Sequence, residues 1–144
     1  MNGGTQMKHS EQANKYHQYD GYNCCQAVLA AYDDVLNIDA SVLFKLSEGF
    51  GIGSGAMNGI CGAVNAGIMI LSYLLSSGDL SGNTNTKGKT YRIIRDYQDR
   101  FQSQTKALIC RHLKDPKSET YTPCANCISI ACDCLDEILT ELPL

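Results

Sequence analysis

Apolar residues recur every three or four positions along most of this 144-residue chain, which is the spacing of one helix face. The clearest case lies near the C-terminus, where a continuous apolar stripe predicts a helix from Cys124 to Leu142. The stripe consists of Cys124, Ile128, Ala131, Leu135, Ile138 and Leu142. No segment shows the alternation of apolar and polar residues that marks a half-buried strand. The pattern therefore predicts an all-α fold.

Five further helices are expected between clusters of polar and turn-forming residues. Their predicted ranges are 6–19, 24–36, 40–48, 61–75 and 87–113. Helix 61–75 is apolar almost all round, which is typical of a buried central helix. Its small residues, Gly62, Ala63, Ala66 and Gly67, would let neighbouring helices approach closely. We expect a single all-helical domain over residues 1–144, a bundle of about five or six helices with antiparallel neighbours.

Three of the eight cysteines, Cys24, Cys61 and Cys124, stand where predicted helices begin. If short loops make neighbouring helices antiparallel, these three helix starts lie at one end of the bundle. Cys110, near the end of the descending helix 87–113, would reach the same end. We therefore expect these four cysteines to cluster at one site, with at least one pair close enough for a disulfide.

The helix starts also suggest a chemistry for these cysteines. The first N–H groups of a helix are unpaired and carry partial positive charge, which favours a thiolate and lowers the pKa of a cysteine. Cys61 also follows the most glycine-rich loop of the chain, residues 51–59. The glycines either leave room around a reactive sulfur or simply shape a turn and pack helices. On the first interpretation, Cys61 is reachable by reagents.

Other residues are expected to have lesser roles. Cys25 and Cys127 are candidate auxiliary thiols, and His112 could lower a thiol pKa or bind a metal. Cys132 and Cys134 lie roughly 7 to 15 Å further along the last helix, too far to share one ion with the cysteines at its start. We expect those two to be packing or surface residues. The two histidines of the polar first helix, His9 and His17, are expected to face solvent.

Composition and charge exclude several function classes. An apolar content of 44% argues against disorder, and a net charge of −3 gives no reason to expect nucleic-acid binding. The polar N-terminus lacks the apolar segment of a signal peptide, and the apolar run 66–75 is too short to span a bilayer. We therefore expect a cytoplasmic protein without membrane association. In that reducing compartment many cysteines favour redox chemistry or metal binding over structural disulfides.

Positive charge is concentrated in one part of the chain. Residues 87–117 contain nine of the twelve lysine and arginine residues. The helix in this segment presents Lys89, Arg92, Arg95 and Arg100. Such a face either docks an acidic redox partner protein or is an ordinary solvated helix surface. The oligomeric state is left open, a homo-oligomer included.

Four short segments, taken in order, resemble the family usually written C_GCAxxG_C_C, whose members are described as redox-active. The resemblance covers about residues 21–135. Two features depart from the family pattern: Ala66 and Gly67 stand in swapped order, and Cys25 and Cys127 are additional thiols. The matching segments are "NCCQAVL" at 23–29, "CGAVNAG" at 61–67, "CRHL" at 110–113 and "CANCISIA" at 124–131.

The resemblance implies a redox role, and three functions are compatible with the residues. The first is thiol/disulfide or electron-transfer chemistry through Cys24, Cys61, Cys110 and Cys124, as an oxidoreductase or an electron-transfer protein. The second is a metal-binding module in which the same four sulfurs hold zinc or an iron–sulfur cluster. The third is a helical interaction protein whose cysteines are structural and which needs no cofactor.

Overall fold

The computed structural model describes residues 7–143, and these form eight α-helices and no β-strand. The all-α class is confirmed, whereas the up-and-down alternation of all neighbouring helices stays a prediction. The start of the first predicted helix, at residue 6, lies outside the described residues. The six longer helices are α1 (His9–Tyr19), α2 (Cys24–Ala31), α4 (Ala40–Ser47), α5 (Gly62–Leu75), α6 (Lys87–Thr105) and α8 (Cys124–Glu141). The two short ones are α3 (Asp33–Leu36) and α7 (Cys110–Lys114).

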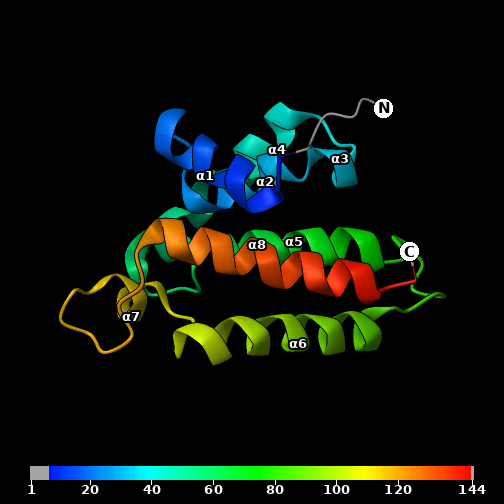
Figure 1. The fold of residues 1–144 in the computed structure, drawn as a ribbon. Coiled ribbons are helices and arrows are strands. Elements are labelled where there is room, and N and C mark those ends of the chain that lie inside the picture. Colours follow the sequence, from blue (N-terminus) through cyan, green and yellow to red (C-terminus); the bar gives the residue numbers. More distant parts are fainter. Residues whose placement is uncertain (1–6, 144) are drawn as a thin grey trace.

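Helix α5 is the central helix, because it packs against α2 on one side and against α6 and α8 on the other. Figure 1 shows α5, α6 and α8 lying side by side, with α1, α2 and α4 stacked above them. Most side chains of α5 are buried, including all four of its predicted small residues. The prediction that a helix apolar all round lies in the centre is thus confirmed.

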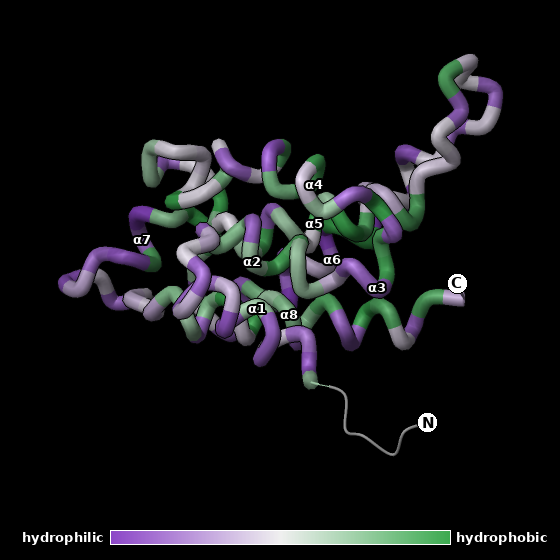
Figure 2. Tube along the Cα trace, turned by 90° about the horizontal axis from the view of Figure 1, so that it is seen from above, coloured by the Kyte–Doolittle hydropathy of each residue, from purple (hydrophilic) through white to green (hydrophobic). Residues whose placement is uncertain are grey.

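Two outer segments depart from the compact packing of the helices. Figure 2 shows the loop after α5, residues 76–86, projecting away from the body of the molecule. At the opposite end, α7 and the loop that follows it are mostly hydrophilic. Within residues 7–143, no helix combines the length and the apolar character that crossing a membrane requires.

Polar contacts hold α1 against α8. His9 Nδ1 lies 3.0 Å from Asp136 Oδ1, and Asn14 Nδ2 donates to Ser129 Oγ at 3.0 Å and to the Ala125 carbonyl oxygen at 3.3 Å. Residue numbers rise along α1 while they fall along α8, so the two helices run in opposite directions. The last turn of α1 consequently lies beside the first turn of α8.

Helix α2 begins at Cys24, as predicted, because Asn23 caps it. The Asn23 side chain accepts from the Gln26 N–H at 2.9 Å, and the Gln26 side chain accepts from the Asn23 N–H at 3.1 Å. This reciprocal cap pairs two donors that a helix start otherwise leaves free. The helix ends earlier than predicted, at Ala31. The next residue, Tyr32, is anchored to α8, where its hydroxyl donates to Asp136 Oδ1 at 2.8 Å.

The predicted continuous helix 87–113 is wrong, because α6 ends at Thr105. Lys106 adopts the left-handed conformation, with a φ of 68°, and the Thr105 hydroxyl donates to the Ala107 carbonyl oxygen at 2.8 Å. These contacts turn the chain before a separate short helix, α7, begins at Cys110. Cys110 is therefore at a helix start and not near the end of a long descending helix.

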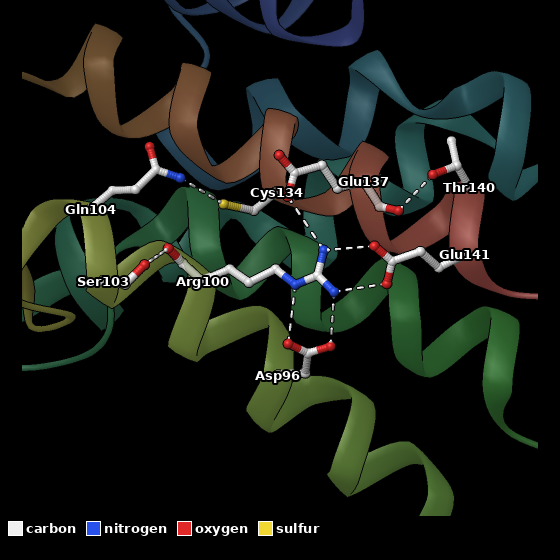
Figure 3. A network of polar contacts seen from close by, with 8 residues as sticks. All are labelled: Asp96, Arg100, Ser103, Gln104, Cys134, Glu137, Thr140 and Glu141. Atoms are coloured by element: carbon white, nitrogen blue, oxygen red, sulfur yellow. Dashed lines mark hydrogen bonds and ion pairs between the residues drawn. The ribbon is translucent and has the colours of Figure 1, made fainter.

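Arg100 joins α6 to α8, as Figure 3 shows. Its guanidinium donates to both carboxylate oxygens of Asp96 on α6, at 3.1 and 3.2 Å. It also donates to both oxygens of Glu141 on α8, at 2.7 and 3.1 Å. The hydrogen bonds from Arg100 to Glu141 lower the pKa of Glu141, and they hold α6 against α8. Recognition of an acidic partner by the remaining basic residues of α6 stays a prediction.

Replacing Gly67 by alanine should destabilise the fold. A Cβ atom at this position would overlap the ring of Tyr97, which is held in place because its hydroxyl donates to the Ala131 carbonyl oxygen at 3.0 Å. We expect Gly67→Ala to lower the free energy of unfolding by about 1–3 kcal/mol, measured by urea denaturation.

Gly88→Ala is the matched control. Gly88 lies in the first turn of α6 with nothing within 4 Å of its Cβ position, so alanine should raise stability by about 0.4–1 kcal/mol. Equal effects of the two substitutions would contradict the close approach of α6 to α5.

Candidate functional site

Cys24 and Cys124 lie together because α2 and α8 begin side by side. Cys124 is the first residue of α8, as predicted, and Pro123 precedes it as the N-cap. The sulfurs of Cys24 and Cys124 and a ring nitrogen of His17 all lie within 4.8 Å of one another. All eight cysteines are within the described range, and Cys124 is the only one that is not buried. This pair thus combines one reachable thiol with one covered thiol.

His17 is part of this cluster, so the expectation that it faces solvent is wrong. It lies in the last turn of α1 and is half-buried, with its Nε2 atom 3.9 Å from Cys24 Sγ. The antiparallel contact of α1 with α8 brings this turn to Cys124. A stacked pair, Tyr16 and Tyr22, with ring centroids 5.0 Å apart, closes the turn between α1 and α2.

Cys61 stands at the N-terminus of α5, as predicted, but it is 1% exposed. The expectation that reagents reach it is therefore wrong. A hydrogen bond from the Cys127 thiol lowers the pKa of Cys61 to about 7, and burial opposes this effect. The N–H groups of Ala63 and Val64 contribute further lowering. Cys127, expected only as an auxiliary thiol, is thus the immediate partner of Cys61.

The glycine-rich loop is joined to the start of α7 and packs against Cys110. The Cys61 N–H donates to the Leu108 carbonyl oxygen, and the Cys110 N–H donates to the Gly59 carbonyl oxygen, both at 2.9 Å. Gly53 has a φ of +66°, and a Cβ atom there would overlap the Cys110 side chain. The loop therefore packs against Cys110, which supports the interpretation that the glycines shape a turn and allow close packing.

Lys114 lies at the end of α7, near several of the thiols. It was not expected from the sequence to be a site residue. Its Nζ donates to the Thr122 carbonyl oxygen at 2.9 Å and to Cys127 Sγ at 3.2 Å. Burial disfavours its charge, but the neighbouring sulfurs raise the Lys114 pKa overall, so it stays protonated. Its charge lowers the pKa of five thiols: Cys24, Cys61, Cys110, Cys124 and Cys127.

Within the pair formed by Cys24 and Cys124, the negative charge is favoured on Cys124. A hydrogen bond from the Cys24 thiol is the largest cause that lowers the pKa of Cys124 to about 5. Burial opposes the shift, and the charge of Lys114 adds to it. The same hydrogen bond, together with burial, raises the pKa of Cys24. These opposite shifts favour the thiolate at Cys124 and the protonated thiol at Cys24.

The remaining cysteines are held as neutral thiols. Burial raises the pKa of Cys25 and of Cys132 to about 12 and that of Cys134 to about 11. It also raises the pKa of Cys110. Cys132 and Cys134 are packing residues, in line with the sequence interpretation.

The structure thus brings Cys24 and Cys124 together, pairs Cys61 with Cys127, and places Cys110 under the glycine loop. His112 is exposed on α7. The functional roles of Cys61, Cys110, Cys25 and His112 stay predictions. Little in the sequence distinguishes the site residues that were not predicted. Lys114, for example, is marked only by its position four residues after Cys110.

Alkylation of the reduced, metal-free protein should distinguish the two pairs. Cys124 and Cys61 both have a lowered pKa, but Cys124 is partly exposed whereas Cys61 is buried. We expect iodoacetamide to modify Cys124 roughly tenfold or more faster than Cys61 at pH 7, because access limits the buried thiolate. Timed labelling with site-resolved mass spectrometry measures both rates. Equal rates would show that burial does not restrict access to Cys61.

The pH dependence of Cys124 alkylation should change when a residue that lowers the Cys124 pKa is replaced. Cys24→Ala removes the largest cause of the lowered pKa, so the pH of half-maximal rate should rise most in that variant. Lys114→Gln should give a smaller rise, while Lys117→Gln, a change at an exposed lysine, should give none. At pH 6 the first two variants should therefore react more slowly than the unmodified protein, and an unchanged profile in both would contradict the assigned contacts.

Comparison with known proteins matches the chain to a family model. Searches of curated proteins and of solved structures found no match to the chain. The family model described as "Putative redox-active protein (C_GCAxxG_C_C)" matches residues 22–138. That match spans α2 to α8 and includes all eight cysteines. The chain therefore belongs to the C_GCAxxG_C_C family.

Proposed function

We propose that this protein carries out thiol–disulfide exchange, with Cys124 as the attacking thiolate and Cys24 as the resolving thiol. One observation carries the proposal: the half-exposed cysteine of the chain has a buried thiol within 4.8 Å of its sulfur. An exposed nucleophile beside a covered second thiol is the arrangement that two-step exchange needs.

The first step is attack by the Cys124 thiolate on a disulfide of the substrate. A mixed disulfide forms between Cys124 and one substrate sulfur, and the other substrate sulfur leaves as a thiolate. In the second step Cys24 attacks the Cys124 sulfur and releases the remaining substrate thiolate. The two cysteines lose two electrons and become a disulfide, while the substrate disulfide gains two electrons and becomes two thiols.

The surroundings of the pair support both steps. The first turn of α8 and the ammonium of Lys114 stabilise the thiolate of Cys124 before attack. Cys24 must lose its proton when it attacks, and His17 Nε2, 3.9 Å from its sulfur, is placed to accept that proton in its neutral form. The His17 imidazole thus serves as the base for resolution.

Cys61 and Cys110 have a supporting role in this proposal. Their backbone N–H groups form the bridge that joins the glycine loop to the start of α7. This bridge positions α7, and Lys114 at its end, beside the reactive pair. Cys61 and Cys127 are both buried, and they form a second dithiol that a substrate reaches only if the packing around them opens.

A small aromatic disulfide that releases a coloured thiolate on reduction tests the proposal. In the reduced, chelator-treated protein we expect two thiolates released per chain and a disulfide between Cys24 and Cys124. Cys24→Ser should stop after the first release and retain the probe on Cys124, seen by intact mass and peptide mapping. Cys124→Ser should lose the fast phase, with an initial rate lower by about tenfold or more.

Cys134→Ser is the control, because Cys134 lies further along α8 and its sulfur accepts from Gln104 at 3.5 Å. It should react as the unmodified protein does. The proposal fails if Cys124→Ser keeps the fast phase, or if the probe retained by Cys24→Ser maps to a different cysteine.

A further inference from the structure

We infer that His17, Cys24 and Cys124, when reduced, form a binding site for a soft divalent cation of the zinc class. This inference goes beyond thiol–disulfide exchange and does not rest on it. The ligand set also differs from the one expected from the sequence, because it includes a histidine of α1 and leaves out Cys61 and Cys110.

The spacing of the donor atoms fits such an ion. Tetrahedral zinc with Zn–S bonds of about 2.3 Å and Zn–N bonds of about 2.0 Å places its ligand atoms about 3.5 to 3.8 Å apart. His17 Nε2 lies 3.9 Å from Cys24 Sγ, and all three donor atoms lie within 4.8 Å of one another. The side chains therefore need to move by less than about one ångström to reach coordination distances.

The chemistry of the donors selects the class of ion. Two sulfurs and one imidazole nitrogen suit zinc and related soft or borderline cations, whereas magnesium and calcium need oxygen ligands. Two thiolates balance the charge of a divalent ion. The half-exposed position of Cys124 gives the ion a route of entry and leaves a fourth coordination position open to water.

The ligands come from three helices whose placement is set by other contacts. Asn23 caps the start of α2, and Asn14 fixes α1 on the first turns of α8. Lys114 Nζ donates to the Thr122 carbonyl oxygen and to Cys127 Sγ, so these bonds hold it near the first turn of α8. The site is therefore assembled before any ion binds, and an ion would tie α1 to α2 and α8.

Metal binding and disulfide formation compete for the same two sulfurs. A disulfide between Cys24 and Cys124 leaves neither thiolate available, so oxidation must release the ion. Conversely, a bound ion protects both sulfurs from oxidation. The site is thus expected to hold the cation only while it is reduced.

Titration of the reduced, metal-free chain with Zn²⁺ against a chromophoric chelator tests this inference. We expect one ion per chain, and with Co²⁺ the absorption bands of thiolate coordination. His17→Ala and Cys124→Ser should each weaken binding by about tenfold or more, since each removes a ligand. His112→Ala, which removes an exposed histidine on α7, should leave the affinity within about twofold.

His17→Cys separates loss of a ligand from loss of structure, because it supplies a new sulfur at the same position and should restore binding. Unchanged affinity in His17→Ala, or no binding at all, would overturn the inference. An equally large loss in Cys61→Ser would point instead to the four-cysteine site. Because the exchange assay is run with chelator and scored on Cys24 and Cys124 variants, either proposal can fail while the other stands.

Discussion

The candidate site depends on positive charge collected at one end of the helix bundle. Helices α2, α5 and α8 all begin there, each with a cysteine at its first position or its cap, and the ammonium of Lys114 lies among these sulfurs. That charge adds to the hydrogen bonds between paired thiols, which are the largest causes that lower the pKa of Cys61 and of Cys124. Burial instead dominates at Cys25, Cys132 and Cys134, whose pKa values are raised. The fold thus divides chemically identical side chains into thiolates and inert packing residues by position.

The sequence was sufficient to predict the features that local patterns determine. Asn23 is a strong capping residue, and the apolar stripe from Cys124 has a clean helical period, so the starts of α2 and α8 were predictable. The end of α6 was not, because neither glycine nor proline marks it. The break depends on Lys106 in a left-handed conformation and on a hydroxyl contact of Thr105, which only the folded chain shows.

The role of His17 and the pairing of Cys61 with Cys127 were not predicted, for a different reason. His17 belongs to a polar helix whose sequence resembles a solvent-exposed one, and its burial follows from the docking of α1 on α8 by Asn14 and His9. The pairing of Cys61 with Cys127 likewise depends on which face of α8 meets the start of α5. Contacts between helices distant in sequence determine both, and a periodic pattern carries no information about which helices meet.

Lys114 also gives the site a charge that depends on its oxidation state. While Cys124 is a thiolate, its negative charge offsets the neighbouring ammonium. A disulfide with Cys24 carries no charge, so the same ammonium would then be unbalanced at the partly open mouth of the site. The electrostatic potential there would become more positive on oxidation, and an approaching anionic surface would be attracted to the oxidised form and released by the reduced one.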